Sequence, residues 1–154
     1  MIIKDIVVED FLNYKRPSMF IATAKCDWKC GVEYCQNTPL AKTPSKEIPN
    51  ETIYKMYHNN DIAKAIVIGG LEPMLQFEEL SALISLFRER GDQSTFVIYT
   101  GYDRDEIDDK VELLKEYSNI IIKFGRYLPN QPLHYDHVLG VNLASENQYA
   151  EHIS

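Results

Sequence analysis

The apolar residues of this chain gather in short continuous runs that end at turn residues. Such runs occupy 18–23 (SMFIAT), 63–70 (AKAIVIGG), 94–101 (STFVIYTG) and 119–125 (NIIIKFG). A short apolar run with glycine at its end predicts a strand buried on both faces, as in a parallel sheet. A weaker run at 137–142 (HVLGVN) predicts one last strand.

Between these runs the apolar residues recur every three or four positions, which predicts amphipathic helices. We expect a short helix over 50–60, with Asn50 as its N-cap, and a longer one over 76–91. Asp103 and Glu106 stand in capping-box spacing at the start of a third helix. The apolar faces of the last two helices comprise Phe77, Leu80, Leu83, Ile84 and Phe87, then Ile107, Val111 and Leu114.

The alternation of strands and helices predicts an α/β fold with a mostly parallel sheet and right-handed crossovers. The cysteine-containing loop follows the first of these strands, and Gly69-Gly70, Thr100-Gly101 and Gly125-Arg126 follow the next three. These turns should therefore meet at the carboxyl edge of the sheet, where such folds place their sites.

Composition limits the class of protein. A chain of 154 residues with 45% apolar residues fits one domain over 1–154. No run approaches the roughly 18–20 apolar residues of a membrane span, and the N-terminus, MIIKDIVVEDF, is not typical of a secretory signal, so we expect a cytoplasmic protein. The net charge is −7 and the basic residues are scattered, which argues against nucleic-acid binding. The acids of 103–116 are interpreted as a solvated helix face.

All the cysteines, Cys26, Cys30 and Cys35, lie in the stretch KCDWKCGVEYCQN. Three cysteines in a reducing compartment do not suit a disulfide framework. Buried small hydrophobes and redox thiols are the alternatives. The clustering and the polar neighbours favour a loop that ligates a metal or an iron–sulfur cluster.

Three thiolates leave a metal centre incompletely coordinated. A structural zinc site closes four positions, and a cubane cluster normally takes four cysteines. A cluster with three protein ligands keeps one iron open, which is typical of catalytic rather than structural sites. The histidines show no paired ligand spacing near the cysteines and are interpreted as ordinary surface or core residues: His58, His134, His137 and His152.

Taken with its neighbouring motifs, the cysteine loop resembles that of the radical S-adenosylmethionine (SAM) superfamily. More narrowly, the chain resembles the small activating enzymes of glycyl-radical enzymes, especially the anaerobic ribonucleotide reductase activase. The resemblance spans about residues 20–148 and rests on four features: the cysteine loop followed by Gln36-Asn37, GGLEP at 69–73, YTGY at 99–102, and KFGRYLPNQP at 123–132 with GVNLASENQ at 140–148.

The resemblance implies that Cys26, Cys30 and Cys35 hold a [4Fe-4S] cluster whose open iron binds the amino and carboxylate groups of SAM. The common spacing in the family is C-x3-C-x2-C, whereas this chain has C-x3-C-x4-C. A loop can absorb the two extra residues, because the cluster fixes the sulfur positions and not the intervening backbone.

The resemblance also implies a set of SAM contacts, each with an ordinary structural alternative. Tyr34 would stack on the adenine or simply pack. Gly69 and Gly70 would admit the methionine amino group, or form any strand-to-helix turn. Glu72 would accept from that amino group or order the loop, where Pro73 fixes the turn.

The remaining contacts implied by the resemblance follow the later strands. Thr100 and Tyr102 would face the cofactor, or form a tight turn before the next helix. Lys123 and Arg126 would bind its carboxylate or ribose, or remain solvated charges. Asn142 would donate a hydrogen bond to the cofactor, or end a strand.

The chemistry implied by the resemblance is reductive cleavage of SAM to methionine and a 5′-deoxyadenosyl radical, which takes hydrogen from a glycine of a partner glycyl-radical enzyme. A flavodoxin- or ferredoxin-like protein would supply the electron under anaerobic conditions. The short chain implies an open partial (βα) barrel of the radical SAM type. The alternatives are a radical SAM enzyme for a small molecule, such as a deazapurine precursor, and a non-catalytic metal-binding module.

Overall fold

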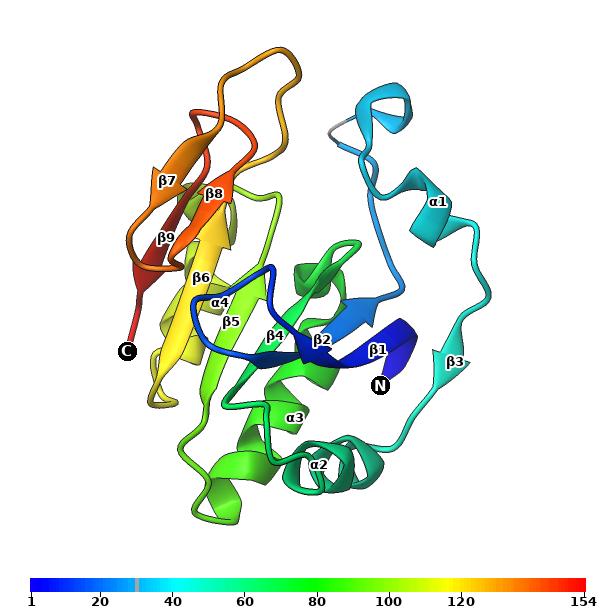
Figure 1. The fold of residues 1–154 in the computed structure, drawn as a ribbon, viewed down its shortest axis with the longest axis vertical. Helices are drawn as coiled ribbons and strands as arrows, with labels where there is room; N and C mark the ends of the chain where they lie inside the picture. The colour runs from blue at the N-terminus through cyan, green and yellow to red at the C-terminus, as the bar shows by residue number, and fades with distance from the viewer. Residues whose placement is uncertain (30) are drawn as a thin grey trace.

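The computed structural model describes residues 1–29 and 31–154, with only the backbone at Tyr34. Within these residues the chain forms a seven-stranded sheet in the order β3-β1-β2-β4-β5-β6-β9 (Figure 1). Its strands are β1 (Ile2–Asp10), β2 (Ser18–Thr23), β3 (Lys46–Glu47), β4 (Ala65–Gly70), β5 (Thr95–Tyr99), β6 (Ile120–Phe124) and β9 (Tyr149–His152). The fold is therefore mixed α/β.

The centre of this sheet confirms the predicted parallel strands. β2 pairs in parallel with β4, β4 with β5, and β5 with β6. Each of these strands lies inside one of the apolar runs predicted from the sequence. The register aligns Ile68 of β4 with Ile21 on one side and Ile98 on the other, and Ile98 with Ile122 of β6. These rows of branched residues are completely buried, which is why each strand is a continuous apolar run.

The margins of the sheet differ from the prediction. β1 and β9 are antiparallel to their neighbours, so the sheet is less parallel than expected. The strand expected at 137–142 is wrong: a separate hairpin forms from β7 (His134–Asp136) and β8 (Val141–Leu143), with a turn between them. The Asp136 carboxylate accepts hydrogen bonds from the backbone N–H groups of Val138 and Leu139, and these bonds fix the turn.

Three of the helices in the described residues follow the predicted periodicity, whereas the four-residue helix at 38–41 was not predicted. The helices are α1 (Thr38–Ala41), α2 (Asn50–His58), α3 (Phe77–Glu89) and α4 (Asp108–Leu114), with 3₁₀ turns η1 (Val32–Tyr34), η2 (Pro73–Gln76) and η3 (Arg104–Ile107). The capping box of Asp103 and Glu106 is confirmed. The predicted cap of α2 is wrong, because Pro49 holds the N-cap position and Asn50 is the first helical residue.

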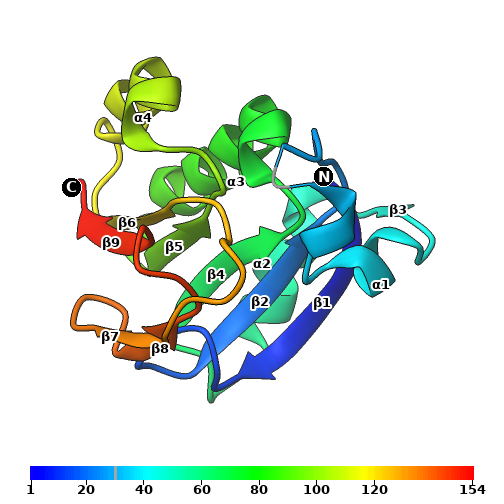
Figure 2. The same ribbon diagram turned by 90° about the horizontal axis from the view of Figure 1, so that it is seen from above.

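The two faces of the sheet are covered differently. α3 and α4 lie on one face, and the β7–β8 hairpin lies on the other (Figure 2). The helical face holds the larger core, in which Phe87 of α3 packs edge-on against Phe96 of β5. No helix in the described ranges combines the length and the apolar character needed to cross a membrane.

The opposite face is partly closed by the segment between β1 and β2. Lys15 N donates to the Leu139 carbonyl at 2.7 Å, and the Tyr99 hydroxyl donates to the Asn13 carbonyl at 2.6 Å. Tyr14 and Leu139 are buried there against the central strands. This contact joins the start of the chain to the β7–β8 hairpin and leaves space near the carboxyl ends of the strands.

Candidate functional site

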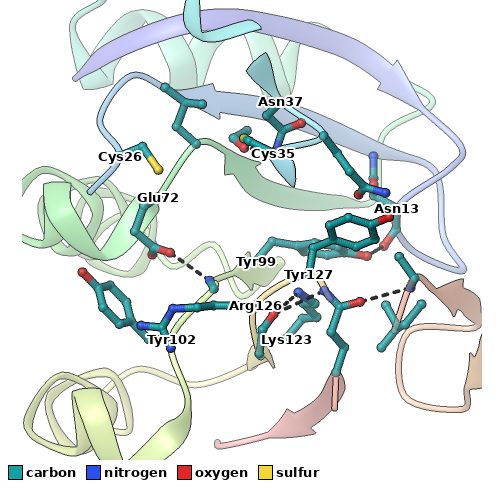
Figure 3. A pocket seen from close by; sticks show the side chains of 18 of the residues that line it. Asn13, Cys26, Cys35, Asn37, Glu72, Tyr99, Tyr102, Lys123, Arg126 and Tyr127 are labelled. Carbon is teal, nitrogen blue, oxygen red and sulfur yellow. Dashed lines mark hydrogen bonds between the residues drawn. The ribbon is translucent and has the colours of Figure 1, made fainter. Parts of the chain in front are cut away.

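A cavity of about 370 Å³ lies at the carboxyl edge of the sheet (Figure 3). Loops that follow β2, β4, β5 and β6 all contribute to its wall, as the parallel order predicts. Its size falls within the roughly 300–1,000 Å³ of small-molecule sites. The residues from these loops include Cys26, Cys35, Gly70, Glu72, Gly101, Tyr102, Gly125 and Arg126.

Two of the three predicted cluster ligands are described, and both line this cavity. Cys26 and Cys35 are partly buried, and Trp28 N donates to Cys26 Sγ at 3.3 Å. Cys30 lies outside the described residues. Among the residues that are described, no three His, Cys, Asp or Glu side chains lie close enough to hold a metal ion. The two thiols nevertheless face one pocket, which suits a shared thiolate-ligated centre.

The cysteine loop is held to the turns around it by hydrogen bonds from both of its ends. These bonds are Ala24 N to Gln76 Oε1 at 2.8 Å, Glu72 N to Lys25 O at 2.7 Å, Tyr102 Oη to Asp27 Oδ2 at 2.5 Å, and Asn37 Nδ2 to Gly70 O at 2.6 Å. The acceptors and donors come from three different elements, so the loop position depends on the tertiary fold.

Glu72 is a buried acid that organises the edge. It accepts hydrogen bonds from Met74 N at 2.9 Å, Thr100 Oγ1 at 2.8 Å and Gly101 N at 2.8 Å. Burial raises the pKa of Glu72, although these hydrogen bonds oppose the shift. Its contacts correspond to the predicted loop-ordering role, and Pro73 begins the adjacent 3₁₀ turn.

The two glycines of the GGLEP motif are explained by neighbouring strands. Gly70 has a φ of 84°, and a Cβ there would lie 2.8 Å from the Ala22 Cα atom. A Cβ on Gly69 would lie 3.3 Å from both the Phe20 ring and the Tyr99 Cβ atom. Packing within the sheet therefore requires glycine at position 70 and leaves little space for a side chain at position 69, and of the two only Gly70 lines the cavity.

Thr100 and Tyr102 are held within the protein. Thr100 is buried and accepts from Tyr102 N at 3.1 Å. Tyr102 is 9% exposed, and two cations lie over its ring, with Lys29 Nζ 4.8 Å and Arg126 Cζ 5.3 Å from the ring centroid. Burial and the hydrogen bond to Asp27 raise the pKa of Tyr102.

The predicted cationic residues have different environments. Lys123 is 7% exposed, and its Nζ donates to the Gly125 carbonyl at 2.8 Å. No carboxylate of the described chain lies within 4.0 Å of this amine, and burial lowers the pKa of Lys123 to about 8. Arg126 instead makes a two-pronged bond to Glu106, with both N–O distances 2.9 Å, which lowers the pKa of Glu106 to about 2. Lys123 is therefore a buried cation rather than a solvated one.

Asn142 and Tyr34 complete the predicted set. Asn142 is exposed on β8, opposite Tyr135, and lines the cavity. Tyr34 belongs to η1, and its side chain lies outside the described residues.

Sequence reasoning missed several polar residues at this edge. Gln148 Nε2 donates to the Gly125 carbonyl at 3.3 Å, and its Oε1 accepts from Ala144 N at 3.0 Å. Asp27 and Asn37 hold the cysteine loop as described above. Asn37 and Gln148 both lie inside the motifs that carry the resemblance, but nothing in the spacing indicated their partners.

A family model described as a 4Fe-4S single cluster domain matches residues 15–141. The match includes every cysteine of the chain and the turns that follow β2, β4, β5 and β6. The chain belongs to this 4Fe-4S single cluster family. A search of the curated proteins found no match.

Membership in the 4Fe-4S single cluster family supports an iron–sulfur cofactor for this protein. The sequence prediction of such a cofactor is confirmed at that level. The thiols of Cys26 and Cys35 in one pocket are consistent with it, since iron–sulfur clusters are held by cysteine thiolates.

Proposed function

We propose that this protein is a radical SAM activase that installs a radical on a glycine of a glycyl-radical enzyme, with anaerobic ribonucleotide reductase as the partner. The observation that carries the proposal is one cavity that joins Cys26 and Cys35 to the buried amine of Lys123. A thiolate-held cluster and a cation in the same pocket suit a ligand with a carboxylate, as SAM has.

The arrangement of elements supports the same proposal. Four parallel strands carry helices on one face and the cavity on the other, at the carboxyl edge. We interpret this as an open partial (βα) barrel of the radical SAM type, extended by antiparallel strands at both margins.

In the proposed mechanism the chain binds and orients the cofactors. When a reduced [4Fe-4S] cluster and SAM are bound, they supply cleavage of the C5′–S bond to methionine and a radical that abstracts hydrogen from the glycine Cα atom. Cys26, Cys30 and Cys35 would hold the cluster and leave one iron open.

Lys123 has a specific part in this proposal. Its amine is desolvated and donates to a backbone carbonyl, and Glu72 acts on it only through space, so a ligand carboxylate would supply a directly bonded countercharge. Phe20 and Tyr99 form an apolar wall beside it, which would exclude water from the reacting atoms.

The rim of the cavity supports a macromolecular substrate. Leu12 lines the cavity and is 80% exposed. Leu128 and Leu133 are also exposed, in the segment between β6 and β7. An exposed apolar rim suits contact with another protein. A flavodoxin- or ferredoxin-like donor would supply the electron, and we expect the reaction to take place in an anaerobic cytoplasm.

The test uses the full chain reconstituted anaerobically with iron and sulfide. After reduction, SAM is added and 5′-deoxyadenosine is measured, with and without an anaerobic ribonucleotide reductase. We expect 5′-deoxyadenosine, and a glycyl radical signal in electron paramagnetic resonance (EPR) when the reductase is present. A Cys35→Ser variant is the control and should give neither.

The outcomes separate the alternatives. A reconstituted cluster that cleaves SAM but never produces a glycyl radical would favour a small-molecule substrate. Protein that binds zinc, or a cluster that leaves SAM intact, would overturn the proposal and favour a metal-binding module.

A further inference from the structure

Tyr102 is directed at the cysteine loop. Its hydroxyl donates to Asp27 Oδ2 at 2.5 Å, and Asp27 directly follows Cys26. The cations of Lys29 and Arg126 both lie over its ring. Lys29 also pairs with Asp27 at 3.6 Å, so one aromatic side chain holds both polar residues on this side of the loop.

The backbone of Tyr102 is itself fixed by the buried acid. Tyr102 N donates to Thr100 Oγ1, whose hydroxyl donates to Glu72. The N–H group of Glu72 in turn donates to the carbonyl of Lys25, the residue before Cys26. Hydrogen bonds that start from Glu72 therefore reach Cys26 from both sides along the chain.

Cys35 is held by a different set of contacts. Thr38 Oγ1 donates to the Cys35 carbonyl at 3.0 Å, and Asn37 Nδ2 donates to the Gly70 carbonyl. Neither contact involves Tyr102 or Asp27. The two described cysteines are thus positioned independently, which makes Cys35 an internal reference for Cys26.

We propose that Tyr102 is a positioning residue for the iron–sulfur cluster, because its hydroxyl fixes Asp27 and thereby the loop that carries Cys26. This inference rests on the cluster that the family supports and on no step of SAM chemistry. It assigns Tyr102 to the protein scaffold of the cluster rather than to direct contact with SAM.

The first test measures the cysteines of the metal-free protein. Trypsin separates residues 26–29, which contain Cys26, from residues 30–42, which contain Cys30 and Cys35, so alkylation can be followed at each site by mass spectrometry. In Tyr102→Phe, which keeps the ring, we expect iodoacetamide to modify Cys26 about three to ten times faster than in wild type. The rate at Cys35 should stay within about twofold.

A double-mutant cycle shows whether the effect passes through Asp27. Asp27→Ala also removes a charge beside Cys26, so its own rate is not the readout. The readout is Tyr102→Phe in the Asp27→Ala background, which should change the rate at Cys26 by less than about twofold. Tyr135→Phe removes a hydroxyl from an exposed ring on β7 and should leave every rate unchanged.

The second test uses the reconstituted protein. Tyr102→Phe should lose iron to a chelator several times faster than wild type and should change the EPR spectrum of the reduced cluster. An unchanged Cys26 rate, an equal increase at all cysteines, or an additive double variant would each overturn the inference. None of these readouts needs SAM cleavage, so failure of the proposed activase function would leave them interpretable.

Discussion

At the carboxyl edge of the sheet, Glu72, Thr100 and Lys123 are buried and make their hydrogen bonds to backbone or to one another. The opposite edge of the sheet lies near α2 and the C-terminal end of α3 (Figure 1). There Glu51 pairs with Arg90, and both side chains are more than a third exposed.

The two edges differ in how much their polar groups reduce the stability of the fold. Burying an ionisable group is unfavourable unless partners compensate it, whereas an exposed ion pair changes stability little. Lys123 is the clearest case, because its described partner is a carbonyl and not a carboxylate. The carboxyl edge therefore gives up stability to place polar groups in a cavity, which is what a binding site requires.

The largest expected effect contrasts the metal-binding capacity of the two edges. Cys35→Ser should reduce iron bound after anaerobic reconstitution to near the background level, because a thiolate ligand is lost. His58→Ala removes the partner of Asp92 at the far edge and should bind iron like wild type. Iron assay and visible absorption are the measurements, and equal losses in both variants would contradict a site confined to the carboxyl edge.

Glycine substitutions test the backbone of the two edges. Gly70→Ala should lower the free energy of unfolding by about 2–5 kcal/mol, since strain at positive φ adds to a clash with Ala22. Gly91 also has a positive φ of 77°, but no atom of the described residues lies within 4 Å of its added Cβ. Gly91→Ala should therefore cost only about 1–2 kcal/mol. Urea denaturation of the metal-free proteins measures both.

Replacing the buried lysine should stabilise the protein. The folded-state pKa of Lys123 is about 8, below its ordinary 10.5, so the charged form is penalised by folding. Below pH 8 that penalty is fully present, and it disappears as pH rises toward 10.5, because the folded state then releases its proton first. Lys123→Met should gain about 2–3 kcal/mol near pH 7 and progressively less toward pH 10.

The measurement for Lys123 is paired urea denaturation of wild type and variant across this pH range. Lys115→Met, at the exposed C-cap of α4, is the control and should show no such trend. A gain for Lys123→Met that stayed constant with pH would mean that packing, rather than the buried charge, had changed.

The smallest expected effect compares two acids. Glu72→Ala leaves Met74 N, Thr100 Oγ1 and Gly101 N without their acceptor and should cost about 1–3 kcal/mol, partly offset because a buried ionisable group is removed. Glu51→Ala breaks an exposed pair with Arg90 and should leave the midpoint of urea denaturation unchanged. Similar losses in the two variants would remove the distinction between the edges.

By itself the sequence determined the central strands and the helices α2, α3 and α4. It also determined the edge of the sheet at which the loops after the strands meet. β4 and α3 have patterns that depend only on which of their own side chains are buried, and a capping box spans only four residues. The clustering of the three cysteines likewise predicted an iron–sulfur cluster, and the family match supports an iron–sulfur cofactor.

Only the tertiary structure decided the margins of the sheet and the roles of individual polar residues. β1 and β9 carry mixed patterns because they lie near the sheet edges and are partly exposed. The hydrogen bond from Tyr102 to Asp27 joins residues 75 positions apart, and the one from Thr100 to Glu72 joins residues 28 positions apart. Local periodicity shows which side chains are buried, but not which residues they bond to. Those hydrogen-bond partners depend on the order of the strands in the sheet, which no local pattern specifies.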